Sequence, residues 1–324
     1  MSHPRVSVAV PLYNEEANLP ELLRRVGAVL DTLPGGPHEL VLVDDGSSDR
    51  SRAMMEEAAR TDPRVVAVFL SRNFGHQAAL SAALDHVSGD VVVLADGDLQ
   101  DPPEEIPRFL QAHADGYDVV YAMRERRKEA LWLRLSYWAY YRLLARLAKP
   151  ALPIDAGDFS LMSRRVVDEI RRTPERHRYL RGLRAWAGFR QIGLPVERAE
   201  RYAGTPKYSL GRLVNLGLDG IFSFSIIPIR AAAFLGAGAM LLTVLFALYA
   251  VYAKLFLDRS PQGFTALVVV VTFVSGVLLF FLGIIGEYVG RIYEEVKARP
   301  VYVVDRVMRG SGDPGRRAPG PYQA

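Results

Sequence analysis

Three oxygen-bearing side chains stand two residues apart in the segment Asp96-Gly97-Asp98-Leu99-Gln100. If this segment is extended, the side chains of Asp96, Asp98 and Gln100 face the same way. Carboxylate and amide oxygens suit Mg²⁺ or Mn²⁺, and Mg²⁺ commonly completes its ligand shell with substrate phosphates. The spacing therefore predicts a metal site for a phosphorylated substrate. The alternative is an acidic turn that only ends a strand.

The elements that would position this segment follow an alternating pattern. Four short apolar runs are typical of strands buried on both faces: Val6–Val10, Leu40–Val43, Val65–Leu70 and Val91–Ala95. Helical patterns fill the gaps at Glu15–Leu30, Asp49–Arg60 and His76–His86. This alternation predicts an α/β domain with a mainly parallel sheet and right-handed crossovers.

Polar clusters follow each of the four predicted strands. They are Pro11-Leu12-Tyr13-Asn14-Glu15, Asp44-Asp45-Gly46-Ser47, Ser71-Arg72-Asn73-Phe74-Gly75-His76 and the acidic segment that begins at Asp96. Taken singly, each is also explained as a strand end or helix cap. Because ligands of parallel sheets bind beyond the carboxyl ends of the strands, the four together predict a ligand crevice. His76 is interpreted either as a substrate contact or as a satisfied capping or core histidine.

Composition narrows the classes of partner. The 324 residues include 40 Lys and Arg against 36 Asp and Glu, giving a formal charge of +4, with many arginines between Arg124 and Arg212. That clustering favours phosphates or a lipid surface, and we expect no nucleic-acid partner. The absence of cysteine excludes disulfides, thiol nucleophiles and Cys-zinc sites.

Two uncharged stretches, Ala231–Ala253 and Phe264–Ile285, approach the ~20 residues that cross a bilayer. They predict two transmembrane helices; the alternative is a pair of buried core helices. Basic residues before the first stretch and after the second favour a cytoplasmic location for both termini. The last residues, 310–324, are rich in Gly, Pro and Arg and predict a disordered tail.

The ordered motifs make a more specific comparison possible. Pro11-Leu12-Tyr13-Asn14-Glu15-Glu16, Val43-Asp44-Asp45-Gly46-Ser47, the segment from Ser71 to His76, and Asp96-Gly97-Asp98-Leu99-Gln100-Asp101-Pro102-Pro103 resemble those of family 2 inverting glycosyltransferases with the GT-A fold. The resemblance is nearest to the polyprenyl-phosphate glycosyltransferases, which include bactoprenol glucosyltransferases and dolichol-phosphate mannose synthase. It covers about residues 6–289. The usual Asp-Ala-Asp is Asp-Gly-Asp here.

The resemblance implies a role for each matching residue on the donor side. Pro11, Tyr13, Glu15 and Asp44 would hold the nucleobase and ribose of a nucleotide-sugar. Asp96 would lie near the nucleoside, and Asp98 with Gln100 would carry Mg²⁺ or Mn²⁺ on the diphosphate, so that Asp96, Asp98 and Gln100 form the predicted metal set. A cation there would neutralise the charge that grows on the leaving diphosphate.

On the acceptor side, a lipid phosphate is already an anion and needs orientation more than deprotonation. Arg124 and Arg134 match an acceptor loop that binds phosphate, and Arg201 and Lys207 match a juxtamembrane phosphate-binding segment, in which Pro206 replaces the usual Ser. Asp158 matches the acidic residue of the reaction centre, as a base or an orienting carboxylate; the alternative is a cap. The predicted catalytic set is therefore Asp98, Asp158, Arg124 and Arg134.

These observations predict four segments: a GT-A domain at 1–205, a juxtamembrane amphipathic segment at 206–229, a two-helix anchor at 230–289 and a cytoplasmic tail at 290–324. The predicted activity is inverting transfer from a nucleotide-sugar, UDP-glucose by resemblance, to undecaprenyl or another polyprenyl phosphate at the cytoplasmic face of the inner membrane. Relatives also suggest a homo-oligomer in the bilayer. The alternatives are a processive polysaccharide synthase and a non-catalytic membrane scaffold with a nucleotide fold.

Overall fold

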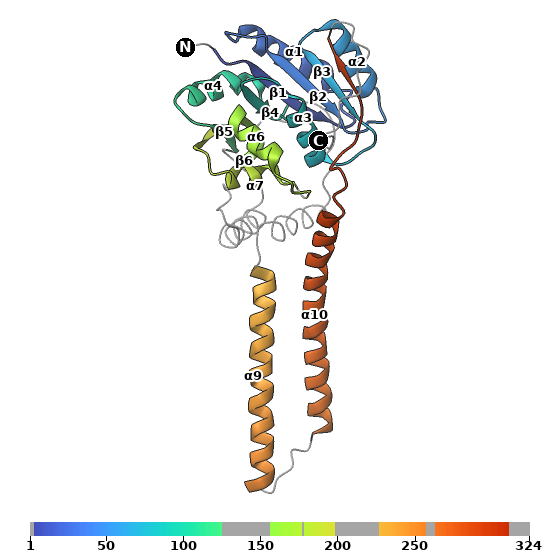
Figure 1. Ribbon diagram of the computed structural model, residues 1–324, viewed down its shortest axis with the longest axis vertical. Helices are drawn as coiled ribbons and strands as arrows, with labels where there is room; N and C mark the ends of the chain where they lie inside the picture. Colours follow the sequence, from blue (N-terminus) through green and yellow to red (C-terminus); the bar gives the residue numbers. More distant parts are fainter. Residues whose placement is uncertain (1–2, 125–155, 177, 198–226, 257–262, 311–324) are drawn as a thin grey trace. The chain divides into compact units, whose positions relative to one another are not determined.

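The computed structural model describes residues 3–124, 156–176, 178–197, 227–256 and 263–310, and the chain divides into two compact units (Figure 1). The first unit comprises Met1–Leu213 and Pro300–Ala324, and the second comprises Val214–Arg299. The chain therefore leaves the first unit and returns to it.

In the described part of the first unit, the central sheet has eight strands in the order β7-β5-β6-β4-β1-β2-β3-β8. The four predicted strands are present as β1 (Val6–Leu12), β2 (Glu39–Asp44), β3 (Val65–Leu70) and β4 (Val91–Leu94). β1 pairs in parallel with β2 and with β4, and β2 pairs in parallel with β3. The predicted α/β domain with a mainly parallel sheet is confirmed.

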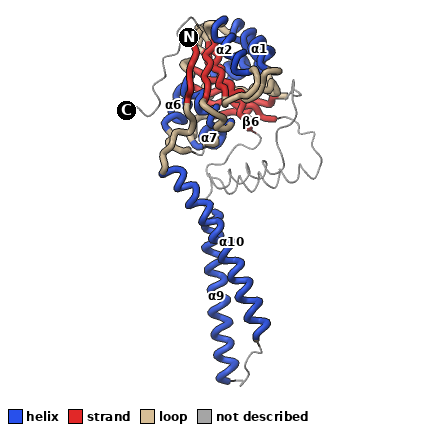
Figure 2. The backbone as a smooth tube through the Cα atoms, turned by 90° about the vertical axis from the view of Figure 1, so that its right-hand side faces the viewer, coloured by secondary structure: helices blue, strands red, loops and turns tan. Residues whose placement is uncertain are grey.

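Helices cover both faces of this sheet, which explains why its strands are apolar on both sides. One face packs against α1 (Leu19–Thr32), α2 (Ser51–Thr61) and α4 (Ile106–Ala114), and η1 (Pro103–Glu105) contacts α1 and α4. The other packs against α3 (His76–His86), α6 (Arg164–Arg172) and α7 (Leu180–Trp186). In Figure 2, α1 and α2 lie on one side of the strands and α6 lies on the other.

Four further strands complete the sheet: β5 (Val119–Arg124), β6 (Ala156–Ser163), β7 (Gln191–Val196) and β8 (Val304–Arg309). β6 runs antiparallel between β4 and β5, whereas β7 pairs in parallel with β5. Because β6 is antiparallel, its first residues reach the same edge as the carboxyl ends of β1, β2 and β4. This strand was not predicted, and it brings Asp158 to that edge.

Strand β8 pairs antiparallel with β3 and corrects the predicted tail. Residues 290–324 were expected to follow the anchor as a tail, but α10 (Phe264–Val296) continues past residue 290 and β8 joins the sheet. The physical reason is that β3 would otherwise present unpaired backbone groups at an exposed edge. The boundary at 205 and residues 206–226 of the predicted juxtamembrane segment lie outside the described residues, as do 311–324.

The second unit contains α9 (Ile227–Phe256) and α10, helices of 30 and 33 residues. The predicted spans Ala231–Ala253 and Phe264–Ile285 fall within them. Among the described residues one helical stretch, Phe273–Val296, is long and apolar enough by length and composition to cross a membrane, with a mean hydropathy of 1.9. The second crossing stays a prediction.

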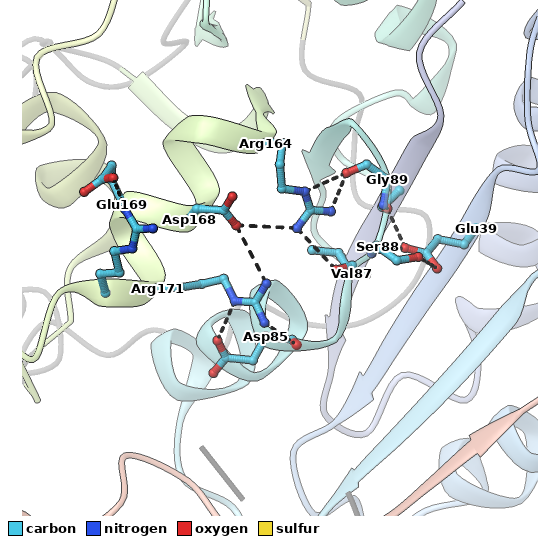
Figure 3. A network of polar contacts seen from close by, with 11 residues as sticks. Glu39, Asp85, Val87, Ser88, Gly89, Arg164, Asp168, Glu169 and Arg171 are labelled. Atoms are coloured by element: carbon cyan, nitrogen blue, oxygen red, sulfur yellow. Dashed lines mark hydrogen bonds and ion pairs between the residues drawn. The ribbon is translucent and has the colours of Figure 1, made fainter. Parts of the chain in front are cut away.

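A polar network ties α6 to α3 and to the loop before β4 (Figure 3). Arg171 lies 3.2 Å from Oδ1 of Asp85 and 3.9 Å from Asp168. Arg164 lies 3.9 Å from Asp168 and donates to the carbonyl of Gly89 at 2.8 Å. These contacts lie at the amino ends of the parallel strands, away from the predicted ligand crevice.

Tyr302, just before β8, extends this network to the C-terminal strand. Its buried hydroxyl donates to Oδ2 of Asp85 at 2.5 Å. Burial and the Asp85 carboxylate raise the pKa of Tyr302, so the hydroxyl keeps its proton. The bond therefore fixes the start of β8 to the last turn of α3.

We expect Tyr302→Phe to lower the free energy of unfolding by about 1–3 kcal/mol, because a buried hydrogen bond to a charged group is lost. Denaturant unfolding of the full-length protein in detergent measures the change. Tyr293→Phe is the matched control, since that ring is 59% exposed on α10. Equal unfolding midpoints for the two variants would contradict the role of this bond.

Candidate active site

The ends of β1 and β2 lie side by side and form the first wall of the site. Leu12 is the register partner of Asp44, so Pro11 and Tyr13 flank the position opposite this carboxylate. Asp44 is fully buried. Its Oδ1 accepts the Ser47 backbone N–H at 3.0 Å, while its Oδ2 has no hydrogen-bond partner among the described residues. A buried acceptor without a donor suits a ligand that supplies one.

The loop after β1 is held by the loop after β2. Asn14 has φ 54° and accepts the Ser48 backbone N–H at 2.8 Å, and the Glu15 backbone N–H donates to Ser51 at 2.9 Å. Tyr13 stays 41% exposed. The structure thus brings Pro11, Tyr13, Glu15 and Asp44 to one edge, as predicted from the strand ends.

Asp45 fixes the loop that leads into α3. Its two carboxylate oxygens accept the backbone N–H groups of Phe74 at 2.7 Å and Gly75 at 3.0 Å. Gly46, at φ 71°, lets this loop approach, because a Cβ there would lie 2.6 Å from the backbone of Arg72 and Asn73. The first residue of α3, His76, is thereby directed to the site.

The acidic segment after β4 is a turn, so the condition under which Asp96, Asp98 and Gln100 would face the same way is not met. Leu99 has the left-handed backbone conformation, with φ 57°, and its apolar side chain is buried. The chain therefore turns within the motif. The Gln100 backbone N–H donates to Oδ1 of Asp98 at 3.2 Å. Asp96, Asp98 and Gln100 therefore do not share one face of a strand, and their role as metal ligands stays a prediction.

Asp158 is the best-defined carboxylate of the site. It is 7% exposed, and both of its oxygens accept hydrogen bonds from Arg181 on α7, from Nε at 2.6 Å and from Nη2 at 2.7 Å. Burial alone would raise the pKa of Asp158, but Arg181 and His76 hold it well below its usual range. Arg181 was missed by the sequence reasoning, since nothing local pairs it with a residue on β6.

His76 lies between two of these carboxylates. Its Nε2 is 3.6 Å from Oδ1 of Asp96 and 3.6 Å from Oδ2 of Asp158. Although burial lowers the pKa of the imidazole, its interactions with Asp158 and Asp96 outweigh burial and raise the pKa above its usual value. The side chain is 41% exposed. Of the two interpretations, the geometry therefore favours the substrate-facing residue over the core histidine.

The negative charge of Asp96 is poorly compensated by neighbouring groups. Its side chain is 24% exposed, and its Oδ1 makes no hydrogen bond to the described part of the chain. Burial, with the carboxylates of Asp158, Asp101 and Asp98, raises the pKa of Asp96 to about 6, although His76 opposes the shift. Such a carboxylate fits a divalent cation, which supplies the missing positive charge.

Ligand atoms of His76, Asp96 and Asp158 lie within 4.8 Å of one another, a grouping that could hold a metal ion. Asp158 is the poorest ligand of the three, because Arg181 occupies both of its oxygens and would repel a cation. The donor chemistry therefore fits a metal on the Asp96 side of the cluster.

A second buried arginine, Arg184, lies one turn after Arg181 on α7. It is 3% exposed, donates to the Gly157 carbonyl at 3.3 Å, and lies 5.1 Å from the ring centroid of Tyr121 on β5. Burial lowers its pKa to about 10, so it stays charged near neutral pH. It adds positive potential beneath the strand that carries Asp158.

Comparison with known proteins decides the family. The family model described as glycosyl transferase family 2 matches residues 7–171. The chain belongs to glycosyl transferase family 2. The resemblance seen in its motifs is thus confirmed, and the chain is a glycosyltransferase.

Relatives of this family 2 glycosyltransferase match over nearly their whole length. It is 42% identical to an uncharacterised glycosyltransferase of Bacillus subtilis, covering 94% of each chain. It is 37% identical to the bactoprenol glucosyl transferase of Shigella phage SfII, covering 95% of this chain and 99% of the relative. It is 38% identical to an undecaprenyl-phosphate 4-deoxy-4-formamido-L-arabinose transferase of Klebsiella pneumoniae, covering 94% of each chain.

Among solved structures, the glucosyl-3-phosphoglycerate synthase of Mycobacterium tuberculosis matches with a TM-score of 0.47 and 23% identity, over 68% of this chain and 78% of that one.

The structure describes only part of the predicted phosphate-binding set. The backbone of Arg124 ends β5 opposite Val196 of β7, at the same edge as Asp158. Arg134, Arg201 and Lys207 lie outside the described residues. Their roles therefore stay predictions.

The raised pKa of Asp96 predicts a gain of stability when its charge is removed. A carboxyl whose pKa is higher in the folded than in the unfolded state opposes folding as pH rises above about 4, and fully above about 6. In EDTA at about pH 8, Asp96→Asn should raise the free energy of unfolding by about 1–2 kcal/mol, and the gain should disappear near pH 4.

Denaturant unfolding at the two pH values measures this change. Asp115→Asn, at an exposed position after α4, is the control and should be neutral at both. A loss of stability for Asp96→Asn at the higher pH would contradict this prediction, because it would mean that groups within the fold stabilise the charged carboxylate.

Proposed function

We propose that this glycosyltransferase transfers a sugar from a nucleotide-sugar to a polyprenyl phosphate, with UDP-glucose as the first donor to test and undecaprenyl phosphate as the acceptor. The identity of the acceptor rests on one observation. The chain is 37–38% identical, over nearly its full length, to proteins named as a bactoprenol glucosyl transferase and an undecaprenyl-phosphate sugar transferase. The strand-end cluster supports the donor. Pro11, Tyr13, Glu15 and Asp44 would hold the nucleoside, with Oδ2 of Asp44 accepting a hydrogen bond from it.

Asp96, Asp98 and Gln100 would hold Mg²⁺ or Mn²⁺. When bound, the metal would neutralise charge on the leaving diphosphate. The orphaned Oδ1 of Asp96 and its raised pKa support this assignment. The solved mycobacterial neighbour is described with Mn²⁺ and UDP-glucose, which makes these the first metal and donor to test.

The acceptor phosphate would be held by arginine and lysine side chains and directed at the anomeric carbon. Arg124 at the end of β5 and Arg134 in the segment that follows would bind it, and Arg201 and Lys207 would contact donor or acceptor phosphates. Guanidinium groups suit this task through bidentate bonds to phosphate. Asp158 would orient the reacting groups, since its bonds to Arg181 leave it poorly suited to accept a proton.

The membrane arrangement that we propose has two crossings, α9 and α10, with both termini and the catalytic unit in the cytoplasm. Strand β8 supports an even number of crossings, because the chain after α10 pairs with β3 in the same sheet that precedes α9. We further propose a homo-oligomer at the inner membrane, and retain the predicted segments with β8 added to the catalytic domain.

The proposed function predicts metal-dependent formation of a lipid-phosphate sugar. Purified full-length protein should convert a polyprenyl phosphate and labelled UDP-glucose to that product, stop in excess EDTA, and recover when Mg²⁺ or Mn²⁺ is restored. A panel of other nucleotide-sugars identifies the donor. Turnover that persists in EDTA would remove the metal from the proposal, and the absence of lipid-linked product with every donor would remove the acceptor.

We expect Asp98→Asn to lower kcat/KM by at least about 100-fold, because charge stabilisation of the leaving diphosphate is lost. The unfolding midpoint should stay close to that of the wild type. Asp115→Asn should retain full activity as the matched control. A rate near that of the control would exclude Asp98 from the site.

A further inference from the structure

The Arg181–Asp158 pair links the start of β6 to the start of α7. Both carboxylate oxygens accept from one planar guanidinium, at 2.6 and 2.7 Å. The Arg181 side chain is 27% exposed and that of Asp158 is 7% exposed. A bidentate pair of this kind fixes the plane of the carboxylate as well as its charge.

We propose that Arg181 is a positioning residue that holds Asp158 as a fixed anion, so that the enzyme transfers sugar to an acceptor that is already ionised and discriminates against water. This inference rests on the proposed function, which supplies the phosphate acceptor. It assigns to α7 a part in acceptor choice.

The two competing reactions differ in what becomes of a proton. In transfer to a phosphate, an acceptor oxygen forms the bond to the anomeric carbon, the bond to the nucleoside diphosphate breaks, and its electron pair leaves with the diphosphate. No proton has to move. In transfer to water, the same bonds form and break, but the attacking water must give a proton to a base.

Asp158 is the carboxylate that the family resemblance places at the reaction centre, and its Oδ2 lies 3.6 Å from the half-exposed His76. A general base needs an oxygen that is open to the water. Arg181 donates hydrogen bonds to both oxygens of Asp158. The wild-type enzyme therefore has a poor base for water at this position.

Removing Arg181 reverses this condition. The Asp158 carboxylate would lose its main partner, and a water could reach the oxygens that Arg181 now engages. Transfer to the lipid phosphate should fall because the orienting group is loose. Hydrolysis of the nucleotide-sugar should fall less, or rise.

The chain offers a matched control pair on the same face of the sheet but at the opposite ends of the strands. Arg165 on α6 donates from Nε to Oδ1 of Asp118 at 2.6 Å and from Nη2 to its Oδ2. The Asp118 side chain is also 7% exposed, but it directly precedes β5 and so lies at the amino end of the strand. Arg165→Met breaks the same kind of bond without touching the site.

The experiment measures lipid-linked sugar and free sugar together, from labelled donor and full-length protein with a polyprenyl phosphate. For Arg181→Met we expect kcat for lipid transfer to fall at least about tenfold with the donor KM within about twofold, and the ratio of free to lipid-linked sugar to rise at least about tenfold. Arg181→Lys should be intermediate, since it restores charge without the bidentate bond. Arg165→Met should leave the ratio unchanged.

Asp158→Asn separates positioning from folding, because it keeps the shape of the side chain. In the double variant Arg181→Met/Asp158→Asn the extra hydrolysis should disappear, so that the effects of the two changes are not additive. If Arg181→Met does not fold, Arg181→Lys and Asp158→Asn carry the same comparison.

An unchanged product ratio in folded Arg181 variants, or additive effects in the double variant, would overturn the inference. Failure of the proposed function gives a different result, in which wild-type protein releases free sugar but labels no lipid phosphate. In that case the role of Arg181 is still tested by the rate of free-sugar release, which should be higher for Arg181→Met than for Arg165→Met.

Discussion

Crowding of carboxylates at one edge of the sheet is the constraint on which the site depends. Each buried carboxylate loses hydration, and neighbouring negative charges add to the cost. The fold meets this cost unevenly. Asp45 accepts two backbone N–H groups and Asp158 accepts two hydrogen bonds from Arg181, whereas Asp44 and Asp96 each keep one oxygen without a donor among the described residues. The uncompensated oxygens are where a substrate or cation gains most by binding.

This arrangement requires the antiparallel strand β6. A purely parallel sheet would bring to this edge only the loops that follow β1 to β4, with their four polar clusters. Because β6 enters from that edge between β4 and β5, its second and third residues, Gly157 and Asp158, lie beside the end of β4. The helix α7 then adds two cations, Arg181 and Arg184, against the strand.

The parts that could be predicted are those that local pattern determines. The strands β1 to β4 can be recognised as apolar runs because both faces of the sheet are covered. The convergence of the polar residues that follow them is expected from the geometry of parallel sheets. The choice between an extended segment and a turn after β4 could not be made from the sequence, because spacing alone does not reveal that Leu99 is buried at φ 57°. The Arg181–Asp158 pair and the β3–β8 pairing depend on contacts between distant residues, for which a single sequence carries no signal.

The pairing of β8 with β3 has a consequence for folding. β3 is buried along its whole length, and without β8 it would be an apolar strand with an open edge, a hazard for association. Its partner is made only after α9 and α10, at a sequence separation of roughly 240 residues, and such distant pairing is slow. β8 itself carries charge toward solvent, with Asp305 paired to Arg52 at 2.5 Å and Arg306 paired to Glu56. The last strand thus closes the sheet and leaves an edge that resists further pairing, so completion of the catalytic unit is coupled to synthesis of the helices that precede it.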